Sequence, residues 1–372
     1  MATLTAVGLA GLANSNGDSS LMVLARSKYG SSLRSIQVSL SNPMRASKTQ
    51  TIATSFILLM FEMITCQTAQ TMNSWVGHIE GVTALLELQN LGAWKNTTHI
   101  RGLLQVCYLI VVGCIIRRIR VPQAIIEWIQ NSQKLQSDTD VLPAYLLFNI
   151  ICRITELHAS CSNNGAKNPT NIISACIGFD NDLSSWVVGL PGVWTYSTST
   201  LKEPHECYGT KYHVYGNPWF ACIWGYYRFC RIMVHQTVLH CLNNFPSSVS
   251  PAIPTATAGY GLQRKRSRTI LVHMCLDMCA SIPYQLGFHE SETLDYSSLL
   301  IPKPSGVFSL LGLIQGLVCA ADAFLELVRA WLPKTLELID KRLGIRQAFI
   351  LRQFIGDLLL LTQSTHGTKS LA

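Results

Sequence analysis

Charge is scarce in this chain. Asp, Glu, Lys and Arg make up 13% of the 372 residues, about half the share that is usual in soluble domains. Hydrophobic residues make up 48%. Much of the surface is therefore thinly charged, or is covered by a partner, a membrane or further sequence. The net charge of +8 is small for this length, so general electrostatic attraction does not by itself predict DNA binding.

Long apolar runs are also lacking. The most apolar segments are 52–61, 103–116 and 306–321, and each is shorter than the ~20 residues that a membrane-spanning helix needs. We therefore interpret them as buried core helices. Because the charge content is low, an integral membrane protein remains an alternative.

The motifs of metal binding and catalysis are missing from the sequence. It has no Cys-x-x-Cys pair, and Cys275 and Cys279 could share a metal ion only with two ligands from elsewhere. It also has no Gly-x-Ser-x-Gly elbow and no glycine loop for phosphates. Asp180 and Asp182 are interpreted as residues that start or cap a helix. We therefore predict no enzyme activity, no catalytic residue, no cofactor and no metal.

Cysteine itself is present, but in an odd number and in apolar surroundings. The chain has 13 cysteines, and Cys107, Cys114 and Cys230 are typical of them because they lie inside apolar segments. Reduced cysteine behaves in this way, as a small buried hydrophobe. A secreted disulfide scaffold would be shorter and richer in turns, so the pattern indicates a reducing compartment.

Helical spacing dominates the apolar pattern, and we find neither alternating strands nor hairpin turn pairs. The fold class predicted is all-α, a multi-helix orthogonal or superhelical bundle in one large domain over residues 1–372. Composition predicts loops at 160–170 and 245–262, the second a mobile linker rich in proline. The helices expected lie near residues 20–40, 49–65, 75–86, 103–116, 123–135, 141–158, 171–186, 218–242, 269–281, 305–330, 333–344 and 345–362.

Several segments follow the order of a known family. The main segments are two aromatic stretches, "FDNDLSSWVVGLPGVWTY" and "YHVYGNPWFACIWGYYRFCRIMVH". The segments "WVGHIEGVTALLELQNLG", "MCLDMCASIPYQLG" and "WLPKTLELIDKRLGIRQA" accompany them. Together they resemble the C-terminal regulatory domain of fungal zinc-cluster transcription factors, and the likeness covers nearly the whole chain. Two departures are Gly225, where the family usually has asparagine, and Ile282, where it has valine.

The resemblance implies a transcriptional regulator in the nucleus, with the cytoplasm as the alternative location. The family's six-cysteine, two-zinc DNA-binding head is not in these residues, so the chain is expected to be incomplete at its N-terminus. It would act through contacts with other regulators or with full-length relatives, without sequence-specific DNA binding of its own. Control of metabolic or secondary-metabolite gene clusters is what such regulators often do. The alternative is a truncated fragment without function.

Two groups of residues are candidate sites. The basic segment "RKRSR", with Arg264, Lys265, Arg266 and Arg268, has the composition of a nuclear import signal, and its alternative interpretation is a solvated basic turn before a helix. The ring-rich segment around Trp219 offers a ligand pocket for a small-molecule effector, with the plain hydrophobic core as its alternative. That candidate pocket comprises Trp219, Trp224, Tyr227 and Arg228.

Overall fold

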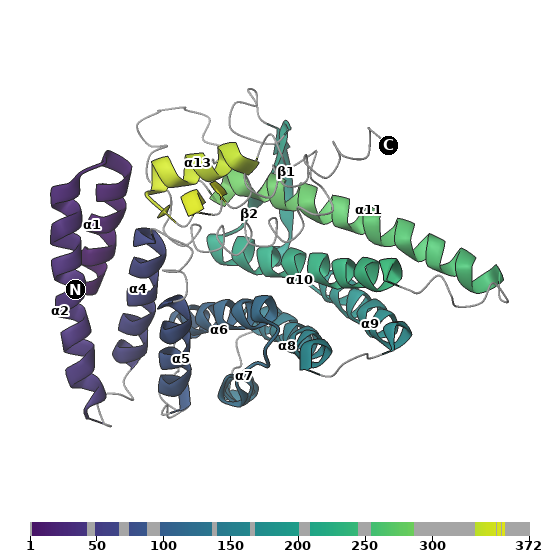
Figure 1. Cartoon of the computed structure of the whole chain (residues 1–372), viewed down its shortest axis with the longest axis horizontal. Helices are drawn as coiled ribbons and strands as arrows, with labels where there is room; N and C mark the ends of the chain where they lie inside the picture. The colour runs from purple at the N-terminus through teal and green to yellow at the C-terminus, as the bar shows by residue number, and fades with distance from the viewer. Residues whose placement is uncertain are drawn as a thin grey trace, which may run out of the picture. The chain divides into compact units, whose positions relative to one another are not determined.

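The computed structural model places most of the chain in helices (Figure 1). Outside the helices, the described residues contain one two-stranded antiparallel sheet. The fold class is therefore all-α, as the sequence predicts. The structure describes residues 2–42, 49–66, 74–87, 97–135, 140–163, 168–200, 209–244, 254–285, 332–346, 348–350 and 352–353.

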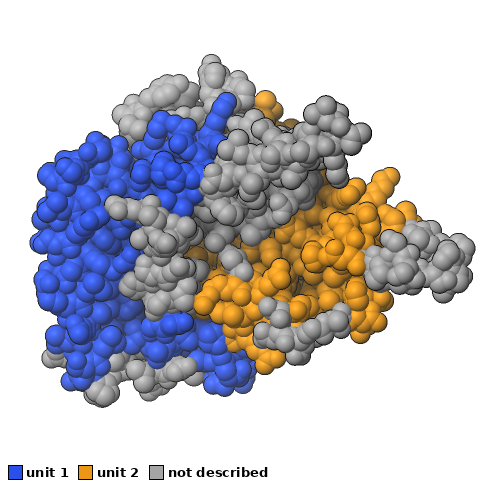
Figure 2. Space-filling view, in the orientation of Figure 1, with its two compact units in different colours: residues 1–95, 122–134, 325–372 blue, residues 96–121, 135–324 orange. Residues whose placement is uncertain are grey.

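The chain forms two compact units, coloured separately in Figure 2. Unit 1 comprises residues 1–95, 122–134 and 325–372, and unit 2 comprises residues 96–121 and 135–324. Each unit therefore combines segments that are distant in the sequence. The prediction of one domain over residues 1–372 stays a prediction.

Unit 1 is built around the first helix, which packs against three others of the unit. Asn14 fixes this arrangement because its Nδ2 donates to the carbonyl oxygens of Ile64, at 2.8 Å, and Gly344, at 2.7 Å. The helices of this unit are α1 (Ala2–Asn16), α2 (Ser19–Leu40), α4 (Thr49–Thr65), α5 (Ser74–Glu87), α7 (Gln123–Leu135) and α13 (Leu332–Leu343).

Helix α1 was not expected, and this part of the sequence prediction is wrong. Its residues are mainly Ala, Leu, Gly and Thr, so the helix has no polar face opposite an apolar one. The break before α2 does have a sequence signal. Gly17 adopts a positive φ of 67°, and Asp18 then caps α2 by accepting hydrogen bonds from the amides of Ser20 and Leu21.

Unit 2 holds the aromatic segments. Its elements are α6 (Thr97–Arg117), α8 (Leu142–Asn163), α9 (Pro169–Val188), the 3₁₀ helix η3 (Gly192–Trp194), β1 (Tyr196–Thr200), β2 (Lys211–Tyr215), α10 (Pro218–Asn243) and α11 (Pro254–Gln285). Two of the buried rings hydrogen-bond to backbone: Tyr108 donates to the carbonyl of Ala144 at 2.6 Å, and Trp186 to that of Pro143 at 2.7 Å. These bonds let the two rings enter the core without leaving their own donors unpaired.

The sheet corrects the expectation that the chain has no strands. β1 and β2 pair antiparallel, from Tyr196 opposite Tyr215 to Thr200 opposite Lys211. Both strands are short, and no two-residue turn signal joins them, which is why the pattern was missed. The sheet is held within unit 2 because β2 packs on α10 and α11.

The loop predicted at residues 245–262 is shorter than the sequence suggested. Helix α11 begins at Pro254, so residues 254–262 are helical, and residues 245–253 lie outside the described residues. Helix α8 continues to Asn163 and α9 starts at Pro169, which narrows the predicted 160–170 loop. The expected helix at 305–330 and nearly all of that at 345–362 lie outside the described residues.

No helix within the described ranges combines the length and hydropathy that a membrane crossing requires.

Candidate functional site in unit 2

Two arginines one helical turn apart mark the site. Arg228 and Arg231 lie on α10, whose side chains are buried along most of its length. Asn217 caps this helix by accepting from the amide of Phe220 at 3.0 Å, and Pro218 occupies its first turn. Each arginine has a different set of partners, and each set links α10 to other elements of unit 2.

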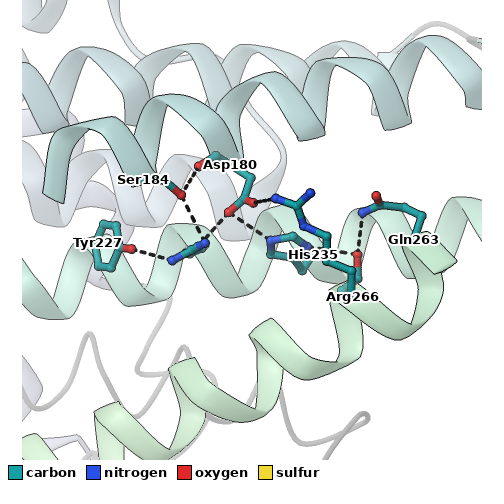
Figure 3. A network of polar contacts seen from close by, with 8 residues as sticks. Asp180, Ser184, Tyr227, His235, Gln263 and Arg266 are labelled. Carbon is teal, nitrogen blue, oxygen red and sulfur yellow. Dashed lines mark hydrogen bonds and ion pairs between the residues drawn. The ribbon is translucent and has the colours of Figure 1, made fainter. Parts of the chain in front are cut away.

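Asp180 of α9 is the centre of the first set, which we call the Asp180 cluster (Figure 3). Its Oδ1 lies 2.7 Å from Arg231 Nε and 3.1 Å from His235 Nε2. Its Oδ2 lies 3.5 Å from Arg266 Nη2. Because these partners come from α10 and α11, one buried carboxylate connects three helices.

A second layer of hydrogen bonds orients these partners. Arg231 donates from Nη1 to the Tyr227 hydroxyl at 2.8 Å and from Nη2 to Ser184 Oγ at 3.2 Å. His235 Nδ1 lies 3.0 Å from Ser267 Oγ, and the Gln263 amide donates to the same Oγ at 3.1 Å. A carboxylate only accepts, so the His235 nitrogen that faces Asp180 carries a proton.

These contacts decide the protonation state of Asp180. Burial alone would raise its pKa, but the hydrogen bonds and charges of His235 and Arg231 outweigh burial and lower the pKa from 3.8 to about 2. The carboxyl group is therefore ionised at every physiological pH. It serves as a fixed anion, which is the opposite of the raised pKa that a general acid at neutral pH would need.

Arg228 is the centre of the second set, the Arg228 cluster, and it is fully buried. Its Nη1 donates to the Tyr215 hydroxyl at 2.8 Å, and its Nη2 lies 3.3 Å from His213 Nδ1. The guanidinium carbon lies 5.1 Å from the Tyr196 ring centre and 5.3 Å from that of Trp224. These are cation–π distances, and Arg228 forms no ion pair with a carboxylate among the described residues.

His213 stays neutral beside this cation. Burial and the charge of Arg228 lower its pKa from 6.5 to about 3. Since arginine only donates, His213 Nδ1 is the acceptor and Nε2 carries the proton, which points the N–H toward Asp277 Oδ1 at 3.9 Å. Burial raises the pKa of Asp277, with Arg228 among the charges that oppose the rise.

The predicted ligand pocket falls on these two clusters. Trp224, Tyr227 and Arg228 are buried, and Trp224 donates from Nε1 to the carbonyl of Trp194 at 2.8 Å. Trp219 is half-buried. The three buried side chains form part of the core that links α10 to α9 and the sheet, while the pocket itself stays a prediction.

The basic segment lies inside α11, so the interpretation as a turn before a helix is wrong. Arg264 donates to the carbonyl of Leu242 at 3.0 Å, and Arg266 pairs with Asp180. Lys265 and Arg268 are exposed, and Ser267 between them is fully buried. Two of the four cations therefore contact the fold, and two face solvent.

Sequence reasoning missed Asp180 and His213. Asp180 was interpreted as a residue that starts or caps a helix, but it lies in the middle of α9 and is buried. The available signal was Arg228 and Arg231 within an apolar helix, since a buried cation requires a partner. That signal does not say which of the chain's acids supplies it.

Several thiols of the described part are weakly acidic because they are buried. Burial raises the pKa of Cys114 to about 11, and the pKa values of Cys152, Cys176 and Cys275 to about 12. A thiol in such an environment is poorly nucleophilic at neutral pH. Within the described residues, no group of three or more His, Cys, Asp or Glu side chains could hold a metal ion.

Comparison with known proteins gives one match. A family model described as the fungal specific transcription factor domain matches residues 1–346. No curated protein and no solved structure matches the chain.

Proposed function

Since the chain belongs to the fungal specific transcription factor domain family through residues 1–346, we propose that it is the regulatory part of a transcriptional regulator that acts through protein contacts. The family match carries this proposal, and it spans segments of both compact units. The Asp180 and Arg228 clusters stabilise unit 2 as a rigid body that can present a surface to partners. The clusters support a structural role because their charged groups are paired or enclosed by rings.

DNA contact is not part of the proposed activity of these residues. The sequence has no Cys-x-x-Cys pair to begin a six-thiolate zinc cluster. Several of its cations are already paired with acids of the chain. The ion pairs of unit 2 include Arg153 with Asp182, at 2.7 Å, and Arg120 with Glu156, at 3.0 Å.

A tethering assay tests the regulatory role. The full chain is fused to a bacterial DNA-binding domain in a yeast carrying the matching operator before a reporter gene. We expect reporter expression to change several-fold relative to the DNA-binding domain alone. No change, from a fusion that accumulates and unfolds cooperatively, would contradict the proposal and favour the alternative of a fragment without function.

A gel-shift assay with the purified chain tests the DNA part. We expect weak, salt-sensitive binding with no preference among sequences. Nanomolar binding to one sequence at physiological salt would show that the chain reads DNA itself. The same preparation tests the membrane alternative, which predicts that the protein is recovered only with detergent.

We place the protein in the nucleus, with Arg264, Lys265, Arg266 and Arg268 as the import signal. The exposure of Lys265 and Arg268 supports this assignment. In a fluorescent fusion, the pair Lys265→Ala and Arg268→Ala should abolish nuclear accumulation. The matched control is Arg117→Ala with Arg120→Ala, which removes two exposed cations elsewhere. Equal localisation of both variants would reject the signal, and uniform cytoplasmic fluorescence of the unaltered fusion would favour the cytoplasm.

A role in a metabolic or secondary-metabolite gene cluster is the finer proposal, and the family supports it only in general terms. Deleting the gene and sequencing the transcripts tests it. We expect coordinated change in one set of neighbouring biosynthetic genes. Changes scattered over unrelated loci would contradict it.

A further inference from the structure

Helix α2 exposes most of its surface. It packs on α1 and α4 of unit 1, yet only Ala25 and Ser32 are fully buried. Val23 is 70% exposed and Val38 is 62% exposed. A 22-residue helix that buries so little has a long face without a partner among the described residues of its unit.

Exposed apolar side chains concentrate on this helix and on its neighbour α1. Single exposed leucines or valines are ordinary on a protein surface, but a concentration of them marks an interaction site. Of the 13 large exposed hydrophobic side chains in the described residues, the following lie on these two helices: Leu4, Leu12, Val23, Leu24, Leu33, Val38 and Leu40.

The spacing along α2 is that of a helix-docking face. Val23, Ser27, Arg34 and Val38 recur at intervals of four, seven and four residues, which places them on one side of the helix. Val23 and Val38 are about 22 Å apart at 1.5 Å per residue. Ser27 and Ser31 between them are small and exposed, so another helix can approach closely over about four turns.

Charge selects the partner. α2 carries the exposed cations Arg26, Lys28 and Arg34, and it has no acidic residue. The acidic residue in the preceding turn, Asp18, accepts hydrogen bonds from the first amides of α2. A second copy of this helix would bring cations against cations, whereas an acidic helix would complement them.

We propose that the outer face of α2 binds an acidic amphipathic helix of another protein. Apolar side chains of the partner pack against Val23 and Val38, and its carboxylates pair with Arg26, Lys28 and Arg34. This inference names the chemistry of the partner in the proposed function, and so rests on it.

Fluorescence anisotropy with a designed probe tests the proposal. The probe is a labelled 18-residue peptide of Leu, Glu and Ala with Leu at every third or fourth position, and it is titrated with the full chain. We expect a Kd on the order of 10 μM, tighter at low salt than at high salt. A peptide with Lys in place of each Glu, and one of scrambled order, should bind at least tenfold more weakly.

Two pairs of substitutions locate the binding face. Val23→Ser with Val38→Ser, and Arg26→Glu with Arg34→Glu, should each weaken binding about tenfold. The side chains are exposed, so the melting temperature should not change. The matched control is Val188→Ser, which alters a valine of unit 2 that is 88% exposed and should leave binding unchanged.

Several outcomes would overturn the proposal. They are equal binding of the lysine peptide, insensitivity to both pairs, concentration-dependent dimerisation that the valine pair abolishes, or α2-dependent binding to phosphatidylserine vesicles. The reporter in the tethering assay does not depend on this probe. If the unaltered chain fails to bind the probe but the reporter is active, the docking face is rejected and the regulatory role remains.

Discussion

Arg228 and Arg231 are one turn apart on the same helix, and unit 2 accommodates their charges by opposite means. Arg231 pairs directly with the Asp180 carboxylate at 2.7 Å. Arg228 is enclosed by the rings of Tyr196 and Trp224 and hydrogen-bonded to neutral groups, Tyr215 and His213. One arginine is matched by an opposite charge, and the other by aromatic faces and hydrogen-bond acceptors.

This contrast predicts which substitutions destabilise each cluster most. Removing an anion from the Asp180 cluster leaves cations behind in a buried place, which is costly. Removing the cation from the Arg228 cluster leaves neutral acceptors, which costs less. The Asp180 cluster should therefore depend on the carboxylate, and the Arg228 cluster on the neutrality of its histidine.

The largest effect should come from Asp180→Ala. The substitution leaves Arg231 and His235 without their shared anion, and we expect a loss of about 3–5 kcal/mol in the free energy of unfolding. Urea denaturation followed by tryptophan fluorescence measures it. Asp182→Ala on the same helix is the control, because the Asp182–Arg153 pair is largely exposed and should contribute less than about 1 kcal/mol. Similar losses for both would remove the central role given to Asp180.

Asp180→Ala should also change how the free energy of unfolding depends on pH in the acid range. The folded-state pKa of Asp180, about 2, lies below its ordinary value of 3.8. The contribution of this carboxyl is therefore fully present above pH 3.8 and disappears as the pH falls toward 2. It amounts to about 2 kcal/mol. An unchanged stability difference between the two proteins at pH 2.5 and pH 6 would contradict this assignment.

Arg228→Met should cost less, about 2 kcal/mol, because it leaves Tyr215 and His213 without a donor but strands no direct ion-pair partner. It should also raise the pKa of His213, since the charge of Arg228 helps to lower it. Denaturation and an NMR titration of the His213 ring measure the two effects. A loss as large as that of Asp180→Ala would erase the contrast between the clusters.

The pH dependence near neutrality tests the neutral histidine. His213 has a folded-state pKa of about 3 against 6.5 for the free group, so its proton enters only the unfolded chain between these values. Stability is then complete above pH 6.5 and falls below it by up to about 1.4 kcal/mol per pH unit. His213→Gln should remove that part of the slope.

His158 provides the comparison for this slope, because burial and Arg118 lower its pKa to about 4. Its contribution to the pH dependence of stability should remain when His213 is replaced. Midpoints of urea denaturation at pH 7, 6 and 5 measure both contributions. The same slope in the parent and in His213→Gln would show that His213 does not titrate as the geometry indicates.

The smallest effect should come from Arg266→Ala. The Arg266 side chain is 58% exposed, and its contact with Asp180 is 3.5 Å long, so we expect a loss below about 1 kcal/mol. Arg268→Ala, in the same exposed stretch, is the control. A loss above 2 kcal/mol for Arg266 alone would mean that the pair holds α11 in place more strongly than its exposure suggests.

Helical spacing was enough to predict much of the fold. α7 was expected at residues 123–135 and α10 at 218–242, and both are observed within one residue of those bounds. In these helices, capping residues and apolar spacing agree. α1 was missed because its small residues show no polar face, and the first half of α11 was missed because its polar composition was taken for a linker.

The site was less accessible to sequence reasoning because its parts are far apart in the chain. Asp180 and Arg231 are separated by 51 positions, and Asp180 and Arg266 by 86. Local patterns assign an isolated acid to a helix end, where such residues are common. Only the packing of α9, α10 and α11 shows that this acid points inward.

The burial of Ser267 has a practical consequence. Trypsin cuts after lysine and arginine but needs an extended chain, and the segment Arg264–Arg268 is helical and is anchored through Arg264, Arg266 and that serine. The rate of cleavage there therefore reports how often the first half of α11 opens. A protease commonly used to check that a preparation is folded would, in this protein, measure the exposure of its most basic peptide.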